Sequence, residues 1–328
     1  MHKVLTIAIP TFNRKDKLER CLESVIRQAD DESIEVLVSD NASDDGTEPF
    51  MNLFIKAHPQ VRYFRNESNL GPDRNFLNCY ERAAGDYVLL IGDDDILMPE
   101  ALGAILEALR LHPVFVHLNT GDILSENPLS YSLPRFAEGP NEYYHSAGDI
   151  FLLMGVYATY VSSLILKTEL VRSIQYKERF VGTFFLQSHV ALETLRGEGI
   201  YAVVKKYCIA ATGNDSVNYD LYDVWGRQYH DLLYGTALSC GIDREAVNSV
   251  YLRSLSDTIL AFVLQFRKTC PDSNRWKKEQ IMKYAKRIPD LRRVYSVAVY
   301  APLPIARLWY RLHLLLADAT RQTRKNGA

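Results

Sequence analysis

Three adjacent aspartates, Asp93, Asp94 and Asp95, are the residues of this 328-residue chain whose types and spacing point most clearly to chemistry. They follow an apolar run, 87–91, that predicts a buried strand, and Pro99 after them predicts the start of a helix. Adjacent carboxylates repel one another, so a cation that they share lowers the cost of keeping them together. Hard oxygen ligands of this kind suit Mg²⁺ or Mn²⁺. The alternative is a polar turn whose aspartates cap the next helix.

Three further groups of polar residues lie directly after apolar runs that predict strands. The apolar runs cover residues 4–9, 34–39 and 61–64. The polar groups that follow them are Pro10 to Arg14, Asp40 to Gly46 and Asn69 to Arg74. Strands and helices alternate up to residue 118, which predicts an α/β protein with a parallel sheet. Because ligands bind beyond the carboxyl ends of such strands, the four groups predict one binding site.

The residue types in these groups predict a site for a nucleoside diphosphate. No GxxxxGK[ST] phosphate loop is present, and the GxGxxA letters at 197–202 precede a predicted strand, whereas a dinucleotide fingerprint follows one. Without a glycine-rich cradle, a diphosphate needs a metal and a cation, which Asp93 to Asp95 and Arg74 can provide. Asp40 can accept a hydrogen bond from a base N–H, and Phe12 can lie against a base or ribose.

Four blocks of the sequence resemble the family 2 glycosyltransferases of the GT-A fold, in that family's order and over roughly residues 4–115. The blocks are Ile9-Pro10-Thr11-Phe12-Asn13-Arg14, Val38 to Thr47, Asn69-Leu70-Gly71-Pro72-Asp73-Arg74-Asn75, and Gly92-Asp93-Asp94-Asp95-Ile96-Leu97-Met98-Pro99. Together they make a specific match, although each is weak alone.

The resemblance implies inverting transfer of a monosaccharide from a nucleoside-diphosphate sugar to a glycan hydroxyl, with Mg²⁺ or Mn²⁺ on the diphosphate. It implies that Asp94 is the main metal ligand, assisted by Asp93 or Asp95, and Asp95 is also a candidate catalytic residue. The donor-binding residues that it implies are Pro10, Thr11, Phe12, Asn13, Arg14, Asp40, Asn41, Ser43, Asn69, Gly71, Arg74, Asp93 and Asp94.

Two positions depart from the family pattern. Gly92 stands where the family usually has the first aspartate of Leu-Asp-x-Asp-Asp. The Glu-Asp pair that usually supplies the general base falls on Gln187-Ser188, neither of which is a useful base. The neighbouring His189 is the candidate base instead, because an unperturbed imidazole pKa of about 6.5 suits the task. The alternative is that His189 is a polar residue on a helix face.

The resemblance and the pattern together predict a GT-A-like, Rossmann-like fold with a mixed, mainly parallel sheet flanked by helices. Residues 1–118 are expected to form the nucleotide-sugar-binding half, and 119–222 the acceptor-side region of the same domain. In that region, strands are predicted at 161–166 and 200–204 and a helix at 184–195. Residues 223–328 are expected to form a mainly helical, basic C-terminal region.

Composition narrows the class of protein and its location. The 47% hydrophobic and 24% charged residues are those of an ordinary soluble protein, and the net charge of −2 gives no general affinity for nucleic acid. Five scattered cysteines form no zinc pattern and read as reduced thiols. The chain shows no signal segment and no apolar run of membrane-spanning length. We therefore expect a cytoplasmic protein.

The last part of the chain predicts peripheral contact with the inner face of the cell membrane. Residues 267–328 hold 15 Lys and Arg against 4 Asp and Glu, and Trp309 and Tyr310 lie in a largely apolar stretch beside Arg307 and Arg311. Such a helix suits an anionic interface. The alternatives are a helix that closes the core and an oligomer contact. By analogy, membrane contact favours as acceptor a polyprenyl-linked oligosaccharide of O-antigen, capsule or a similar polysaccharide.

Two other functions compete with sugar transfer. A sugar nucleotidyltransferase shares the α/β edge and the metal, but it requires a glycine-rich, basic loop after the first strand, and Pro10 to Arg14 is not one. A catalytically silent nucleotide-sugar or glycan-binding protein is compatible with the missing Glu-Asp pair.

Overall fold

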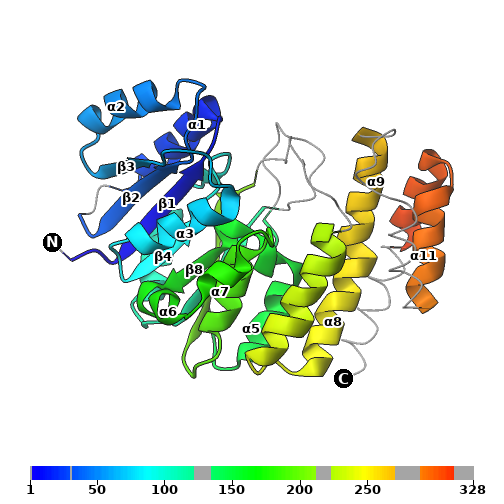
Figure 1. Cartoon of the computed structure of the whole chain (residues 1–328). Helices are drawn as coiled ribbons and strands as arrows, with labels where there is room; N and C mark the ends of the chain where they lie inside the picture. The colour runs from blue at the N-terminus through cyan, green and yellow to red at the C-terminus, as the bar shows by residue number, and fades with distance from the viewer. Residues whose placement is uncertain (1, 30–31, 122–133, 212–222, 270–288, 314–328) are drawn as a thin grey trace.

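The computed structural model describes residues 2–29, 32–121, 134–211, 223–269 and 289–313 of the chain (Figure 1). Its described strands form one mixed sheet that contains strands from both predicted parts of the domain, residues 1–118 and 119–222. In spatial order the strands are β3 (Val61–Arg65), β2 (Ile34–Asp40), β1 (Leu5–Thr11), β4 (Tyr87–Leu90), β8 (Leu164–Lys167), β6 (Phe115–Thr120), β9 (Tyr201–Ala210) and β5 (Ile96–Leu97), and β7 (Glu142–Tyr144) pairs with β9.

The sheet is mainly parallel in its first half, as predicted. β1 pairs in parallel with β2 and β4, β2 pairs in parallel with β3, and β6 pairs in parallel with β9. β8 lies antiparallel between β4 and β6. The sequence pattern predicted a strand at 161–166 without its direction, and in the structure residues 161–163 form a 3₁₀ turn (η2, Val161–Ser163) before the strand begins.

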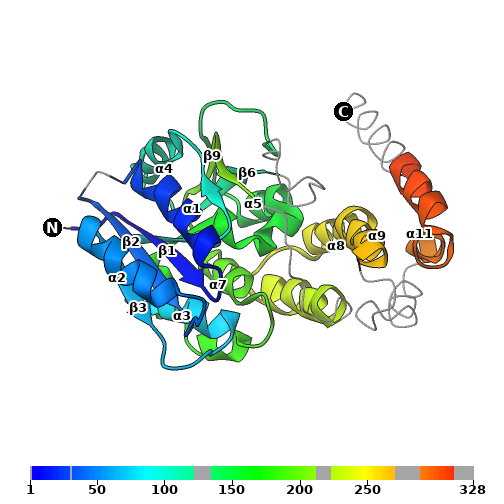
Figure 2. The same ribbon diagram turned by 90° about the horizontal axis from the view of Figure 1, so that it is seen from above.

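Side chains of the strands alternate between the two faces of the sheet and pack into two hydrophobic cores, one on each face. Leu5, Ile7 and Ile9 of β1 belong to the core that α1 (Lys15–Ile26) and α4 (Ala101–Leu109) cover, whereas Ala8 belongs to the core on the opposite face. That second core contains residues of α3 (Pro72–Arg82), α5 (Ala147–Met154), α6 (Thr168–Ser173) and α7 (Leu186–Thr194), and α2 (Thr47–Ala57) packs beside β3. Figure 2 shows α1 and α4 on one side of the strands and α3 and α7 on the other. With helices on both faces, the functional residues are left to the loops at the strand ends.

Apart from short connections at 240–243 and 301–302, the described residues after 222 are helical, which confirms the predicted mainly helical C-terminal region. The segments are η4 (Asp223–Gln228), η5 (Asp231–Ala237), α8 (Arg244–Ser254), η6 (Leu255–Ile259), α9 (Leu260–Thr269), α11 (Pro289–Tyr300) and the helical residues 303–313. They extend the second core away from the sheet (Figure 1). Within the described residues, no helix combines the length and the apolar character that crossing a bilayer demands.

Candidate functional site

The four polar loops predicted from the sequence contact one another at the carboxyl edge of β1, β2 and β4. Thr11 at the end of β1 donates its hydroxyl to Asp93 Oδ2 at 2.7 Å, across 82 positions of sequence. The Asn13 backbone N–H donates to Ser43 Oγ at 2.9 Å, and the Asp44 N–H donates to Asn13 Oδ1 at 2.8 Å. Asn13 has a φ of 53°, in the left-handed region that asparagine tolerates better than most residues.

Cations from the start of α1 neutralise two of the three aspartates. Arg14 Nη1 lies 3.1 Å from Asp93 Oδ1 and 3.1 Å from Asp94 Oδ2, and Lys17 Nζ lies 3.8 Å from Asp94 Oδ2. Burial raises the pKa of Asp93 to about 6, an effect that Arg14 opposes and Asp94 reinforces. Lys17 was not predicted as a site residue, although its position three residues after Arg14 places both cations on one helix face.

The third aspartate, Asp95, is hydrogen-bonded to Ser162 and lies close to Gly92. Ser162 Oγ donates to Asp95 Oδ2 at 2.5 Å and accepts the Gly92 N–H at 2.9 Å. A Cβ at position 92 would lie 2.9 Å from Asp95 Oδ2, so the aspartate usual in the family would require the Asp95 carboxylate to shift from this position. Nothing in the sequence pointed to Ser162, which comes from η2 on the acceptor side.

The carboxylates fit a metal ion only if a bound substrate completes its ligand shell. Among the described residues, no group of three or more His, Cys, Asp or Glu side chains is arranged to hold a metal. Asp94 is the more open of the two aspartates that face Arg14, with 16% of its side chain exposed against 6% for Asp93. Mg²⁺ is commonly held by one or two carboxylates together with substrate phosphates. The donor set at Asp93 and Asp94 matches that kind of site.

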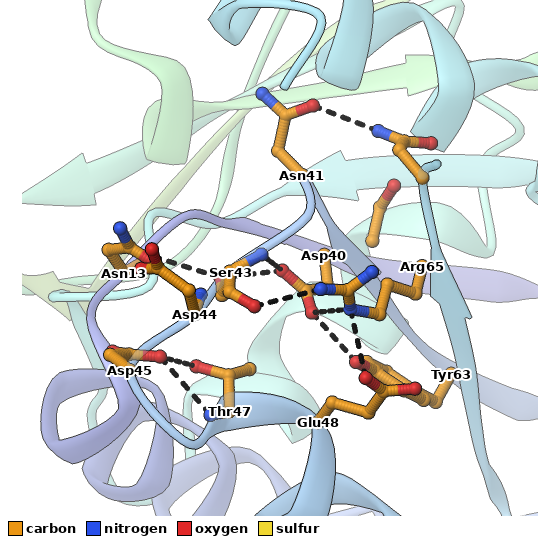
Figure 3. A network of polar contacts seen from close by, with 12 residues as sticks. Asn13, Asp40, Asn41, Ser43, Asp44, Asp45, Thr47, Glu48, Tyr63 and Arg65 are labelled. Carbon is orange, nitrogen blue, oxygen red and sulfur yellow. Dashed lines mark hydrogen bonds and ion pairs between the residues drawn. The ribbon is translucent and has the colours of Figure 1, made fainter. Parts of the chain in front are cut away.

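Asp40 is buried within a network that fixes the loop after β2 (Figure 3). Its Oδ1 accepts the Ser43 N–H at 2.9 Å and the Ser43 hydroxyl at 2.6 Å. Its Oδ2 accepts the Tyr63 hydroxyl at 2.7 Å and lies 3.5 Å from Arg65 Nε. Burial, reinforced by Asp40, raises the pKa of Tyr63. With 0% exposure and both oxygens occupied, Asp40 holds Ser43 and is closed to a nucleotide base, so the expected contact with a base N–H is absent from this conformation.

A second network, made of asparagines, holds the loop after β3 against the end of β2. Asn41 Nδ2 donates to Asn69 Oδ1 at 2.8 Å and to the Gly71 carbonyl at 3.2 Å. Asn66 Nδ2 donates to Asn41 Oδ1 at 3.0 Å and to Asn75 Oδ1 at 3.1 Å. Asn41, Asn69 and Gly71 were predicted site residues, and the structure gives them this shared backbone-fixing role. Asn66 and Asn75 were not predicted.

Several predicted residues remain open to a ligand at this edge. Phe12 is 40% exposed, whereas the predicted site residue Pro10 is buried within β1. Arg74, the third residue of α3, is exposed and has no ion pair within the parts of the chain that the structure describes. Gly71 occupies the N-cap position of α3, and Asp73 Oδ2 accepts the N–H groups of Gly182 and Phe184 at 2.7 and 3.2 Å.

His189 packs inside the helical layer, with its ring against Phe180 of η3 (Lys177–Phe180) and its Nδ1 against Thr236 of η5. Its ring stacks on Phe180 with centroids 4.3 Å apart and an interplanar angle of 5°, and Nδ1 lies 2.7 Å from Thr236 Oγ1. The residue is 4% exposed. Burial lowers the pKa of His189 to about 4, with a further lowering by Arg179 that Glu193 opposes. A buried imidazole of such low basicity is poorly suited to take a proton from an acceptor hydroxyl.

Replacing His189 with glutamine is expected to leave kcat within a few-fold of the wild-type value, because the side chain packs instead of reacting. A general base contributes about 10²- to 10⁴-fold, so a loss of that size in steady-state assays would contradict this expectation and restore His189 as the base.

The same substitution is expected to reduce the loss of folding free energy that occurs as the pH falls from neutral to acid. The unfolded chain protonates His189 near its ordinary pKa of 6.5 and the folded chain only near about 4, so folding stability is lost as the pH falls through this window. The full effect is about 3 kcal/mol, of which urea unfolding of wild type and His189→Gln at pH 7 and pH 4.5 measures about 2 kcal/mol.

Comparisons with known proteins agree with this architecture. The model of the family described as "Glycosyl transferase family 2" matches residues 6–166. Abequosyltransferase RfbV of Salmonella typhimurium is 33% identical over 228 residues, which are 65% of this chain and 68% of that protein. GalNAc(5)-diNAcBac-PP-undecaprenol beta-1,3-glucosyltransferase of Campylobacter jejuni is 27% identical over 54% of this chain, and the match spans just over half, 56%, of its own length.

Solved structures show the same fold. Residues 1–349 of TarS from S. aureus, in complex with UDP-GlcNAc, superpose with a TM-score of 0.63 at 16% identity, over 93% of this chain and 89% of that one. The mannosyltransferase PcManGT from Pyrobaculum calidifontis, in complex with GDP-Man and Mn²⁺, gives a TM-score of 0.52 at 16% identity, over 98% and 87% of the two chains. The predicted GT-A-like fold is confirmed. With its family-model match and its close relative RfbV, the chain belongs to glycosyl transferase family 2.

Proposed function

We propose that this glycosyltransferase moves a monosaccharide, with inversion, from a nucleoside-diphosphate sugar to a hydroxyl of a lipid-linked glycan. The observation that carries the proposal is the meeting of four loops at one sheet edge, where Asp93 and Asp94 face Arg14 and Lys17. Such a site holds carboxylates for a metal and cations for a diphosphate side by side. The name of the Campylobacter relative includes a PP-undecaprenol-linked glycan, which supports a lipid-linked acceptor here.

Catalysis at this site would rest on stabilising the departing nucleoside diphosphate. Asp94, supported by Asp93, is the group to hold Mg²⁺ or Mn²⁺, and such an ion supplies positive charge to the leaving group. Arg14 and Lys17 already lie beside these carboxylates, so they can share the added phosphate charge without a large movement. Arg74 adds a cation in the first turn of α3, where the helix N-terminus also favours anions.

The remaining loop residues would position the nucleoside and keep the site in shape. The exposed ring of Phe12 can cover a base or ribose. Thr11 orients Asp93, and Asp40 and Asn41 act through Ser43, Asn69 and Gly71 by fixing the loops on either side. Asp95, held by Ser162, joins the aspartate turn to the acceptor side of the sheet.

A lipid-linked acceptor would place the reaction at a membrane surface. We therefore propose that the protein works at the inner face of the cell membrane as a peripheral protein. The charge of residues 267–328 supports this location, because 15 Lys and Arg against 4 Asp and Glu attract anionic lipid.

One observation favours a second candidate, a nucleotide-sugar-binding protein without transfer activity. Gln187 and Ser188 occupy the position of the family's Glu-Asp pair, and both are buried in α7, where Gln187 donates to the Thr159 carbonyl at 2.8 Å. Donor binding without turnover, across a broad panel of glycan acceptors, would favour this candidate.

Calorimetric titration with UDP, dTDP, CDP and GDP, each with and without Mn²⁺, tests the proposed site. We expect one of these nucleotides to bind in the presence of Mn²⁺ and at least about tenfold more weakly without it, because the ion and the diphosphate complete each other's ligand sets. If none binds under any condition, the four-loop site does not bind nucleotides and the proposed transfer is wrong.

A further inference from the structure

The helical segment 303–313 packs on the protein with one face. Ala306 on that face is fully buried, and the Tyr310 hydroxyl donates to the Asp257 carbonyl at 2.8 Å. The Trp309 ring is partly buried against the second core and stacks on His313 with centroids 5.5 Å apart. The aromatic pair that the sequence suggested for a membrane interface is thus engaged with the protein.

The opposite face of this segment carries an apolar stripe that the described protein leaves uncovered. Ile305, Leu308 and Leu312 are 56%, 62% and 52% exposed. Spacings of three and four residues align them along one side of a helix, and Arg311 is exposed next to them. We call Ile305, Leu308 and Leu312 the docking stripe. Figure 2 shows the segment at the end of the molecule farthest from β1, β2 and β3.

Exposed leucines elsewhere do not form such a set. Leu53 on α2 is 69% exposed, Leu70 lies in a loop, Leu111 follows α4, Leu152 is on α5 and Leu252 is on α8. Each stands on a different element, and isolated exposed apolar residues are normal on soluble proteins. Three aligned aliphatic side chains on one helix face therefore need a partner of their own.

Charge identifies the partner as a lipid surface. Residues 289–328 hold seven Lys and Arg against two Asp and Glu. An aliphatic stripe flanked by arginines has the composition of a helix that lies in a membrane interface, where apolar side chains enter the acyl boundary and the cations meet anionic headgroups. A second copy of this chain would bring the same excess of positive charge against itself, which disfavours self-association through this face.

We propose that the docking stripe inserts into the surface of a bilayer containing anionic lipid and holds the enzyme there reversibly. This inference rests on the lipid-linked acceptor of the proposed function and names the element that would reach the membrane. Three side chains bury little area, so attachment is weak, depends on the surrounding cations, and falls with salt.

Sedimentation of the full-length protein with vesicles tests the proposal. We expect wild type to pellet with vesicles of phosphatidylcholine mixed with phosphatidylglycerol, and to remain in solution with phosphatidylcholine alone or at high salt. The double substitution Leu308→Glu and Leu312→Glu should weaken partitioning into the mixed vesicles by about tenfold or more, because it places two carboxylates at an anionic interface.

A matched control is Leu53→Glu with Leu111→Glu, which adds the same charges at exposed leucines outside the stripe. This control should pellet like wild type. The proposal is overturned if wild type pellets no better with mixed vesicles than without vesicles, or if the stripe variant pellets as wild type does. It is also overturned if the stripe variant only dissociates a dimer on size-exclusion chromatography. Nucleotide titration of the same preparations reports the donor site separately, so a stripe that fails while nucleotide binding persists leaves the proposed transfer intact.

Discussion

Replacing Asp94 with asparagine is expected to lower kcat/KM for sugar transfer by about a thousandfold, the scale of losing a key charge-stabilising group in an active site. The side chain keeps its shape and loses its charge, so the change tests electrostatics and not packing. Asp94 lies within 3.1 Å of Arg14 and 3.8 Å of Lys17, and its side chain is more exposed than that of Asp93. Without this charge, a metal at this edge would lose its most exposed carboxylate, and the leaving diphosphate would lose much of its counter-charge.

The matched control is Asp16→Asn, which removes the same charge from a side chain that is 91% exposed, in the first turn of α1 beside Lys17. Steady-state rates at saturating Mn²⁺, with nucleotide affinity from calorimetry, separate binding from chemistry. A thousandfold loss in Asp94→Asn with a near-normal Asp16→Asn supports the metal-ligand role. If Asp94→Asn kept most of its activity, the metal role would have to pass to another carboxylate, and the proposed site would need a different arrangement.

Much of the site could be predicted because its residues obey a rule of topology. Polar groups after successive strands of a parallel sheet meet at the carboxyl edge, so Thr11 and Asp93 could be expected in one site although 82 positions separate them. The same reasoning from the sequence placed Arg14 and Asn41 at this edge of the sheet. Alternation of strands and helices was sufficient for this step, because it fixes the direction of the strands and therefore the edge.

The parts that sequence reasoning missed depend on packing between distant segments. Asp40 reads as an open acceptor at a strand end, yet Tyr63 and Arg65 from the neighbouring strand close over it. Ser162 reaches Asp95 only because β8 runs antiparallel beside β4, a direction that no local pattern specified. His189 and the expected base position beside it, Gln187 and Ser188, are all buried in α7, and this burial comes from packing that the local sequence pattern did not show.

Replacing Asn75 with leucine is expected to lower the free energy of unfolding by about 3 kcal/mol, since buried polar groups left without partners cost about 1–3 kcal/mol each. Asn75 is 3% exposed. Its Nδ2 donates to the Ser39 carbonyl at 2.8 Å, and its Oδ1 accepts the Ser39 hydroxyl at 2.7 Å and the Asn66 amide at 3.1 Å. Leucine has a similar size but can form no hydrogen bond with these groups, so the buried Ser39 hydroxyl and the Asn66 amide each lose a hydrogen-bond partner.

Urea unfolding of Asn75→Leu beside Asn52→Leu, the same change at an exposed position of α2, measures the cost of the lost hydrogen bonds alone. The surface variant should stay within about 0.5 kcal/mol of wild type. Because Asn66 also holds Asn41, which fixes Asn69 and Gly71, loss of Asn75 should weaken nucleotide binding together with stability. Lower stability with unchanged nucleotide affinity would mean that the loop holds its shape without the network. A decrease of less than 1 kcal/mol in the free energy of unfolding would show that the remaining asparagines satisfy one another's hydrogen bonds without Asn75. The loops at this edge of the sheet would then be held in place by the sheet alone.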